Sequence, residues 1–289
     1  LTPHLDRLSA EGITFTRCMS NSPLCVPARV SLMNGQLVRE HGIWSNRKGG
    51  DENGPSHVRN IRDAGYHTSV IGKTHLWSTS AKGQQGLHIR EMDQNLEAWG
   101  FEYRLEVNDP MLTGPMDCHY TEYLDSKGLL EAHREYIMQW VKESYWGGDP
   151  HPWNQPPAPV PEGDDIDSYI GRKSVEWLKD YQDDRPFYLQ VQFTGPHDPY
   201  DGPQEYREMY DASSLDPGIM ELPKEPYPLG MEGRIKRGAA IASATEEQRQ
   251  QWRVNYYANV TLIDEWVGKI LEALEKKEEL DNTLIIFNS

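Results

Sequence analysis

A set of side chains in this sequence has the chemistry needed to bind and cleave a tetrahedral anion. Its members are Cys25, Arg29, Lys73, His75 and His197. Lysine and arginine neutralise the oxygens of an oxyanion, and histidines transfer protons to and from reacting groups. Taken singly, most of these residues would be interpreted as solvated charges or structural histidines, and a lone cysteine as a packed thiol. Their combination in one chain favours a functional site.

The residues of this set follow segments that have the pattern of β-strands. Strands are predicted at 13–16, 66–71 and 186–193, where β-branched, aromatic and other apolar residues alternate or run together. Helices are predicted at 3–12, from Pro27 onward, at 58–64 and at 168–180. This alternation is typical of an α/β fold with a mainly parallel central sheet flanked by helices, in which ligands bind at the carboxyl ends of the strands. We therefore expect the candidate residues to meet at one edge of the sheet.

Two further regions complete the predicted organisation. Residues 77–165 are rich in Gly, Pro, Trp and Tyr and have weak periodicity, apart from a helix predicted at 131–145. We interpret them as a loop-rich insertion that covers the site. The alternative is that they are solvent-exposed loops with no role in the site. A long helix is predicted from Thr245, where Thr245 and Gln248 match a capping box, and a last strand is predicted at 283–287.

The composition argues against nucleic acid as the main partner. The 289 residues carry 29 basic and 45 acidic side chains, a net charge of −16, whereas nucleic-acid binding needs a basic stripe. No apolar run is long enough to span a bilayer. Cys18, Cys25 and Cys118 are too few for a disulfide scaffold. The length allows one large domain or two ordinary ones, and we expect a single catalytic domain over residues 1–289.

The segments that carry the candidate residues resemble the signatures of the type I, formylglycine-dependent sulfatases of the alkaline phosphatase-like superfamily. The run Cys25-Val26-Pro27-Ala28-Arg29 resembles the first signature, although many members have Ser in place of Ala28. The run from Gly65 to Leu76, which contains Gly-Lys-Thr-His, resembles the second. Pro196-His197-Asp198-Pro199 resembles a Pro-His-x-Pro element. The resemblance covers nearly the whole chain and implies a sulfuric ester hydrolase.

The resemblance implies a role for each candidate residue. Cys25 would be converted to formylglycine (3-oxoalanine) by a formylglycine-generating enzyme. The aldehyde hydrate would attack the sulfur of a small-molecule or carbohydrate sulfate ester and would also contact a metal ion. Arg29 would hold the hydrate, and Lys73 would bind both the hydrate and the sulfate oxygens. His75 would assist loss of sulfate from the covalent intermediate, and His197 would contact the sulfate and help protonate the leaving alcohol.

The resemblance also implies one divalent cation, Ca²⁺ in most members with Mg²⁺ as the alternative, bound by acidic pairs near both ends of the domain. Those pairs are not in the printed sequence. We therefore expect the chain to be incomplete at both its N- and C-terminal ends, with the remaining ligands outside it, and the printed chain to bind metal poorly and be inactive. Two other functions are kept as alternatives. One is a phosphonate or phosphate ester hydrolase of the same superfamily, and the other is a non-catalytic binding protein that has kept the fold.

Overall fold

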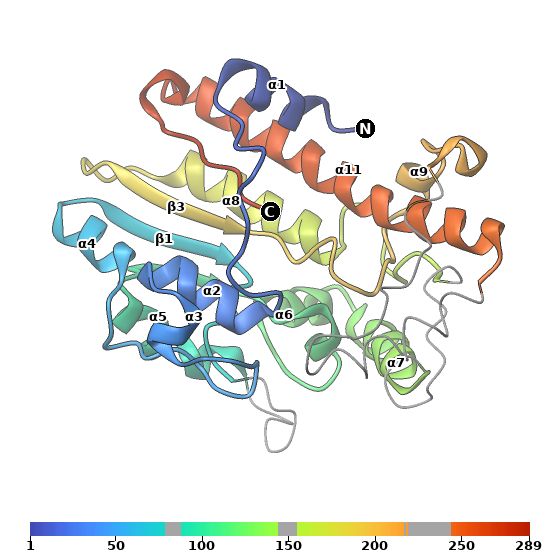
Figure 1. Cartoon of the computed structure of the whole chain (residues 1–289), viewed down its shortest axis with the longest axis horizontal. Coiled ribbons are helices and arrows are strands. Elements are labelled where there is room, and N and C mark those ends of the chain that lie inside the picture. The colour runs from blue at the N-terminus through green and yellow to red at the C-terminus, as the bar shows by residue number, and fades with distance from the viewer. Residues whose placement is uncertain (79–87, 144–154, 217, 219–243) are drawn as a thin grey trace.

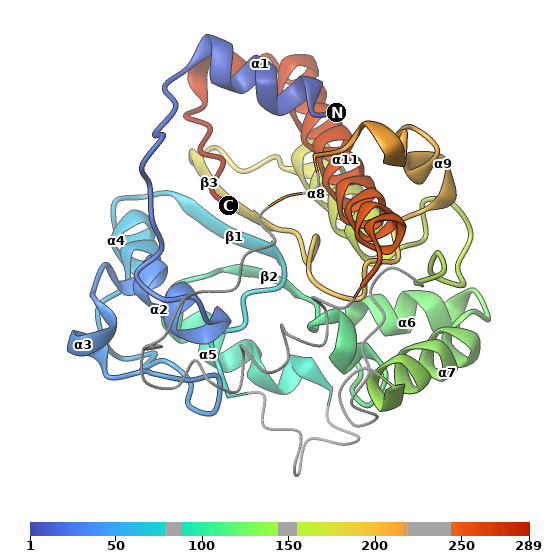
Figure 2. The ribbon, with the colours of Figure 1, turned by 45° about the vertical axis from the view of Figure 1, so that its right-hand side comes forward.

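A parallel β-sheet organises the part of the chain that the computed structural model describes, which comprises residues 1–78, 88–143, 155–216, 218 and 244–289. Within these ranges the sheet has three strands, β1 (His67–Gly72), β2 (Tyr103–Glu106) and β3 (Phe187–Gln192), in the order β2-β1-β3. Figure 1 labels β1 and β3, and Figure 2 labels all three. Both pairs are parallel, and Gly72 is in register with Glu106 on one side and Gln192 on the other. The strands therefore end together, and the predicted parallel α/β architecture is confirmed.

Helices cover both faces of this sheet, as Figures 1 and 2 show from two directions. On one face α8 (Ile166–Asp180) packs against β1 and β3, α11 (Glu246–Lys276) packs against α8, and α1 (Pro3–Glu11) packs against α11. The other face carries α2 (Cys25–Asn34), α3 (Val38–His41), α4 (His57–Asp63) and α5 (Asp93–Trp99). The sheet is thus the middle layer of the fold.

The hydrophobic core fills the space between these layers. Val70 and Ile71 of β1 are fully buried, and they belong to one cluster with Trp99 of α5 and Ile170 of α8. Burial of a large apolar side chain contributes about 1.5–3 kcal/mol relative to leaving it exposed. This packing holds β1 rigidly, and β1 is the strand that leads directly into Lys73 and His75.

The described part of region 77–165 contains more regular structure than the sequence predicted. It holds β2, α5, α6 (His119–Ser126), α7 (Leu130–Val141) and two 3₁₀ helices, η1 (Ile89–Met92) and η2 (Pro110–Thr113). Strand β2 belongs to the central sheet and was not predicted. The helix predicted at 131–145 is confirmed as α7 up to Val141, and residues 144 and 145 lie outside the described ranges. That the region covers the site stays a prediction.

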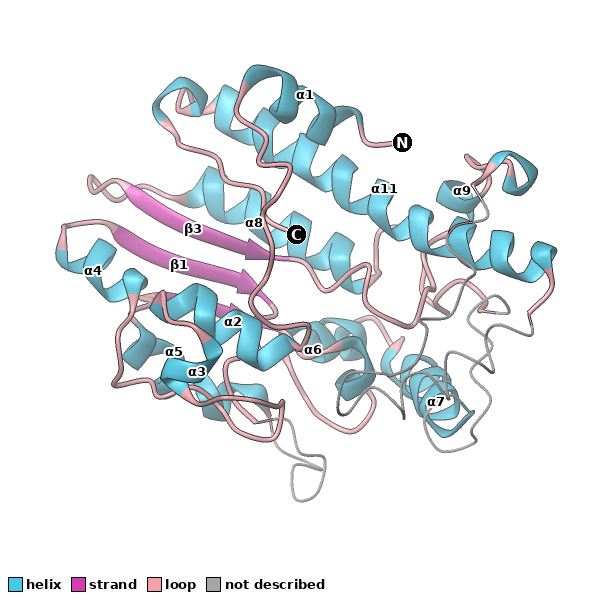
Figure 3. Cartoon of the chain, viewed as in Figure 1, coloured by secondary structure: helices cyan, strands magenta, loops and turns pink. Residues whose placement is uncertain are grey.

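The strands predicted at 13–16 and 283–287 are wrong, because both segments are loops (Figure 3). Ile13, Phe15 and Leu284 are 83 %, 77 % and 85 % exposed. Their residue pattern suits a strand, but a strand also needs a neighbour to complete its backbone hydrogen bonds. Among the described residues no strand pairs with either segment.

The helices predicted elsewhere are confirmed with small shifts of their ends. α2 begins at Cys25, two residues before Pro27. The capping box at the start of α11 is present, since Thr245 Oγ1 accepts from the Gln248 N–H at 3.2 Å and Gln248 Oε1 accepts from the Thr245 N–H at 2.8 Å. The other described elements are α9 (Gln204–Arg207), η5 (Ala212–Ser214) and η6 (Leu280–Asn282). No helix within the described ranges is long and apolar enough to cross a membrane.

Candidate active site

Two strand ends and the first turn of a helix bring the candidate residues together. Lys73 and His75 follow β1, and His197 lies in the loop that follows β3. Cys25 is the first residue of α2; it follows a loop, and the predicted strand before it is absent. The side chains of His197, His75 and Lys73 all interact with the side chain of Cys25 and lower the pKa of its thiol. These residues, which are far apart in the sequence, therefore surround one point.

Arg29 fastens helix α2 to the ends of β1 and β3. Its Nη1 donates to the backbone oxygen of Lys73 at 2.6 Å and to Oε1 of Gln192 at 2.5 Å. Burial lowers the pKa of Arg29, but an arginine stays charged throughout the physiological range. Its guanidinium adds positive charge to the site and at the same time fixes the distance between Cys25 and the strand ends.

The environment of Cys25 stabilises negative charge on its side chain. The hydrogen bonds from His197 and His75 lower the pKa of the thiol to about 5, aided by the charge of Lys73 and opposed by burial. Its position in the first turn of a helix acts in the same direction. An electron-rich oxygen or sulfur at residue 25 would therefore be well accommodated.

The two histidines differ in their protonation. Burial alone would lower the pKa of His197, but hydrogen bonds to Asp198 and Cys25 and the charge of Asp109 raise it to about 10. Its Nδ1 lies 2.8 Å from Asp198 Oδ1, and its Nε2 lies 3.7 Å from Asp109 Oδ2. Burial lowers the pKa of His75, which has 5 % of its surface exposed. At neutral pH His197 is thus a proton donor, whereas His75 is a neutral proton acceptor.

Two buried acids that the sequence analysis missed lie at the end of β2. Asp109 forms an ion pair with the ammonium group of Lys73. Glu106 Oε1 accepts from the backbone N–H of Thr74 at 2.8 Å, from the Thr74 hydroxyl at 3.1 Å and from the backbone N–H of His75 at 3.4 Å. The sequence pattern of β2 does not identify it as a strand. The rule that ligand-binding residues follow strand ends therefore does not point to these two acids. Glu106 and Asp109 position the loop that carries Lys73 and His75.

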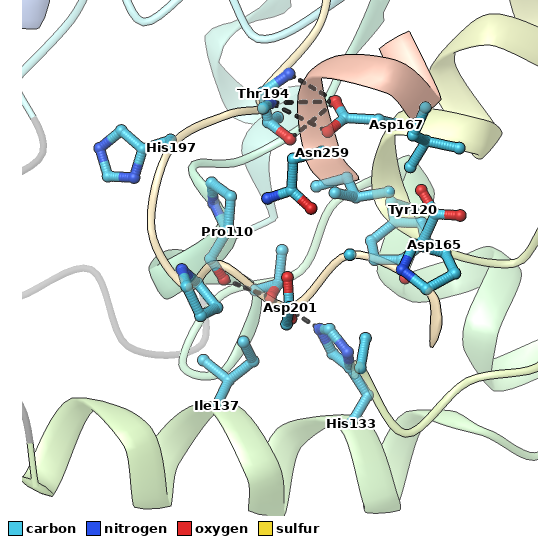
Figure 4. Close-up of a pocket in the computed structure, with 18 residues that line it drawn as sticks. Pro110, Tyr120, His133, Ile137, Asp165, Asp167, Thr194, His197, Asp201 and Asn259 are labelled. Carbon is cyan, nitrogen blue, oxygen red and sulfur yellow. Dashed lines mark hydrogen bonds between the residues drawn. The ribbon is translucent and has the colours of Figure 1, made fainter. Parts of the chain in front are cut away.

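A third buried acid, Asp167, fixes the loop that carries His197. Its carboxylate accepts from the backbone N–H of Thr194 at 2.7 Å, from the Thr194 hydroxyl at 3.0 Å and from the backbone N–H of Gly195 at 2.9 Å. Figure 4 shows these bonds beside a cavity of about 40 Å³, whose lining includes Asp167, Thr194 and His197. Burial raises the pKa of Asp167 to about 6 and that of Asp201, which also lines the cavity, to about 7.

The chain as a whole matches one family of enzymes. The family model described as "Sulfatase" matches residues 1–289. The chain belongs to the sulfatase family. A choline-sulfatase of Rhizobium meliloti is 30 % identical over 295 residues, which are 99 % of this chain and 52 % of that protein. An arylsulfatase of Clostridium perfringens is 25 % identical, over 100 % of this chain and 57 % of that protein.

A solved structure supports the same fold for this sulfatase chain. The phosphonate monoester hydrolase of Agrobacterium radiobacter superposes with a TM-score of 0.70 at 20 % sequence identity, over 99 % of this chain and 57 % of that one. At this identity the likeness establishes the fold. The chain spans about half the length of the curated relatives that it matches.

The described residues of this sulfatase chain do not provide a site for the divalent cation that the family resemblance implies. Within those ranges no three His, Cys, Asp or Glu side chains are grouped so that they could hold a metal ion. A hard cation needs about six oxygen ligands, and residue 25 can supply only a small share of them. Metal binding therefore stays a prediction.

Proposed function

We propose that this protein hydrolyses sulfate monoesters, with residue 25 as the nucleophile after conversion of Cys25 to formylglycine. One observation carries the proposal. The side chain at position 25 interacts with His75 and His197, which lie after different strands, and lies beside the cations Lys73 and Arg29. Family membership of the whole chain adds the reaction class. The chain spans about half the length of these relatives, so the activity is proposed for the whole protein.

The surroundings of Cys25 fit the proposed modification. A hydrated formylglycine supplies two hydroxyl groups on one carbon, one to attack sulfur and one to help release sulfate. The half-buried side chain of Cys25 lies among hydrogen-bond donors and cations that already stabilise negative charge at this position. The same donors would stabilise an attacking oxygen.

Arg29 and Lys73 hold the reacting groups in this proposal. The side chain of Lys73 is 3 % exposed, so little water competes with its ammonium group for an oxyanion. Arg29 bonds the Lys73 backbone and the Gln192 side chain, so that its charge is fixed in place. Preorganised cations of this kind stabilise the charge that develops on oxygens in the transition state.

The histidines divide the proton transfers. His197, protonated at neutral pH, donates a proton to the alcohol oxygen as the ester bond breaks. His75, neutral at the same pH, accepts the proton from the side chain at position 25 when the sulfate group leaves. The opposite pKa shifts of the two residues suit opposite roles. We further propose a divalent cation, Ca²⁺ or Mg²⁺, whose ligands lie largely beyond the described residues.

A small organic sulfate ester is the substrate class that the relatives favour. The choline-sulfatase and the arylsulfatase cover this chain almost completely, and their names refer to small-molecule sulfates. Sulfated carbohydrates are the alternative substrate class. Choline sulfate, p-nitrophenyl sulfate and a sulfated monosaccharide would be compared at equal concentration with the matured, metal-loaded enzyme.

The proposal is tested first by mass spectrometry of the peptide that contains Cys25. In protein produced with a formylglycine-generating enzyme, we expect the peptide to lose sulfur and gain oxygen. Cys25→Ala should lower sulfatase activity by about 10³-fold or more. Cys18→Ala is the matched control, because Cys18 is an exposed free cysteine outside the set of candidate residues, and it should keep activity. An unmodified Cys25 in matured protein, or an active Cys25→Ala variant, would contradict the proposal.

The alternative of a phosphonate or phosphate ester hydrolase is tested with the same protein. Sulfate, phosphonate and phosphate groups are all tetrahedral, so the types of the site residues do not distinguish between them. Turnover of p-nitrophenyl sulfate and of the p-nitrophenyl monoester of phenylphosphonate would be compared. Faster turnover of the phosphonate would favour the alternative. Absence of turnover with both, together with unmodified Cys25, would favour a non-catalytic binding protein.

A further inference from the structure

A carboxylate lies inside the site at which an anion is expected to bind. Asp109 stands three residues beyond the end of β2, and its side chain is 5 % exposed. It forms an ion pair with Lys73, whose side chain is 3 % exposed. Its Oδ2 also lies 3.7 Å from Nε2 of His197. An acid that contacts both of these cations reduces the positive charge available to a bound anion.

Asp109 is held in its charged form. Burial alone would raise its pKa, but the charges of Lys73 and His197 and the hydrogen bond from Lys73 lower it. The other nearby acid of β2, Glu106, has its pKa raised to about 8 by burial and is therefore mostly uncharged at neutral pH. Asp109 is consequently the source of fixed negative charge beside Lys73 among the described residues at the end of β2.

We propose that Asp109 is a specificity-determining residue that favours substrates with one negative charge over substrates with two. This inference rests on the proposed function, in that it assigns the anion to the site formed by Lys73, His197 and residue 25. The ammonium group of Lys73 contacts the Asp109 carboxylate and, in this proposal, an oxygen of the bound anion. The distance from that oxygen to the carboxylate is therefore at most about the sum of the two contact distances. At about 5 Å in a partly buried site, a second ligand charge interacts with a carboxylate strongly enough to change affinity about tenfold or more.

The substrates that Asp109 would separate differ in charge while sharing geometry. A sulfate monoester and a phosphonate monoester each carry one negative charge. A phosphate monoester loses its second proton near pH 6 and carries close to two charges at pH 8. All can be made with the same p-nitrophenol leaving group, so a difference between them does not come from the leaving group.

The experiment measures kcat/KM at pH 8 for p-nitrophenyl phosphate, p-nitrophenyl phenylphosphonate and p-nitrophenyl sulfate, using the matured, metal-loaded enzyme. In the unsubstituted protein we expect the phosphate to be at least about tenfold worse than the phosphonate. In Asp109→Asn, the ratio of kcat/KM for the phosphate to kcat/KM for the phosphonate should rise about tenfold or more. The ratio of sulfate to phosphonate should change by less than about threefold, because both are monoanions.

The matched control is Asp198→Asn. Asp198 Oδ1 lies 2.8 Å from Nδ1 of His197. The other cation, Lys73, forms its described ion pair with Asp109 and not with Asp198. Loss of its charge should lower activity through His197 for every substrate and leave the phosphate-to-phosphonate ratio within about threefold. An equal rise of that ratio in Asp198→Asn would overturn the assignment to Asp109.

Thermal unfolding shows whether each variant is folded, and Asp109→Ser provides a second neutral side chain. If Asp109→Asn or Asp109→Ser is folded and its phosphate-to-phosphonate ratio of kcat/KM is unchanged, the inference is overturned. So does an unsubstituted enzyme that hydrolyses phosphate and phosphonate equally well, whatever the variants do. The proposed function fails separately, if the sulfate ester is not turned over, because the phosphate-to-phosphonate comparison needs no sulfatase activity.

Discussion

Asp167 and Thr194 are joined by two hydrogen bonds, from the backbone N–H of Thr194 at 2.7 Å and from its hydroxyl at 3.0 Å, both accepted by Asp167 Oδ1. The other carboxylate oxygen accepts from the N–H of Gly195 at 2.9 Å. One buried side chain at the start of α8 therefore determines the path of the loop between β3 and His197. We infer that Asp167 is a positioning residue, because it acts on the reaction only through His197.

Asp167→Asn tests this positioning role. The amide retains one acceptor oxygen but turns a donor NH₂ group toward a backbone N–H, so a bond is replaced by repulsion. We expect the free energy of unfolding to fall by about 1–3 kcal/mol. We also expect kcat to fall about tenfold with little change in KM, because a displaced acid affects the chemical step more than binding. Denaturant unfolding and steady-state kinetics measure the two effects.

Asp165→Asn is the control for Asp167→Asn. Asp165 is also buried, lies two residues away and caps α8 by accepting from the Ser168 N–H at 2.9 Å. Asparagine is an equally good N-cap, so stability should change by less than about 1 kcal/mol. Activity should be retained. A loss of kcat as large as that of Asp167→Asn would mean that the start of α8, rather than the bond to the loop, is responsible.

His197→Asn tests the assignment of His197 as the acid for the leaving group. Asparagine keeps a polar side chain of similar size but cannot transfer a proton at neutral pH. General acid catalysis contributes typically about 10²–10⁴-fold. We expect a loss of that size for an alkyl sulfate, whose alcohol needs a proton, and a much smaller loss for p-nitrophenyl sulfate. Equal losses of kcat/KM for the two esters would indicate that His197 binds the sulfate without donating a proton.

Glu106→Gln tests the pH dependence of stability. Burial raises the pKa of Glu106 from 4.5 to about 8 despite the donors that face Oε1. Between those values the folded protein binds a proton that the unfolded chain has released, so stability falls as pH rises from about 4.5 to about 8. Between pH 5 and pH 8 the loss from this residue is on the order of 3–4 kcal/mol.

Glutamine keeps the acceptor oxygen of Glu106 but has no proton to lose. We therefore expect the Glu106→Gln variant to gain stability relative to the unsubstituted protein as pH rises over this range. Denaturant unfolding at pH 5 and pH 8 measures the difference. Other acids with raised pKa values, such as Asp167 and Asp201, contribute equally to both proteins and cancel. A constant difference between the two proteins would show that Glu106 is ionised in the folded state.

The sequence predicted the location of the candidate residues because local patterns identify β1 and β3. Lys73, His75 and His197 follow segments with clear apolar runs, and parallel strands end at the same edge of a sheet. The register of Gly72 with Gln192 brings the two loops together. No long-range information was needed for this part of the site.

The buried acids could not be predicted, because their surroundings depend on contacts between distant parts of the chain. Asp109 is paired with a lysine 36 positions earlier, and a single sequence contains no trace of that pairing. The four-residue strand Tyr103–Glu106 contains two charged residues and lacks the continuous apolar run typical of a strand in a parallel sheet. Conversely, Ile13 and Phe15 have a strand pattern but no described strand to pair with.

Gly72→Ala tests how closely β1 and β3 must approach where the site begins. Gly72 has φ +113°, and a Cβ atom there would lie 2.0 Å from the backbone oxygen of Gln192. That oxygen accepts the N–H of Lys73 at 2.9 Å, a bond that positions Lys73. We expect the variant to lose about 3 kcal/mol or more of folding free energy, through backbone strain and the clash. Sulfatase activity should fall with it.

Gly65→Ala separates the clash from the backbone strain. Gly65 precedes the same strand and has φ +100°, but a Cβ atom there would meet nothing within 4 Å. Only the conformational strain should be felt, at a cost of about 1–2 kcal/mol. Denaturant unfolding of the two variants therefore isolates the contribution of the contact with Gln192. Equal destabilisation would mean that β3 can move away from Gly72 at little cost, and that the close register of the two strands is not needed to place Lys73.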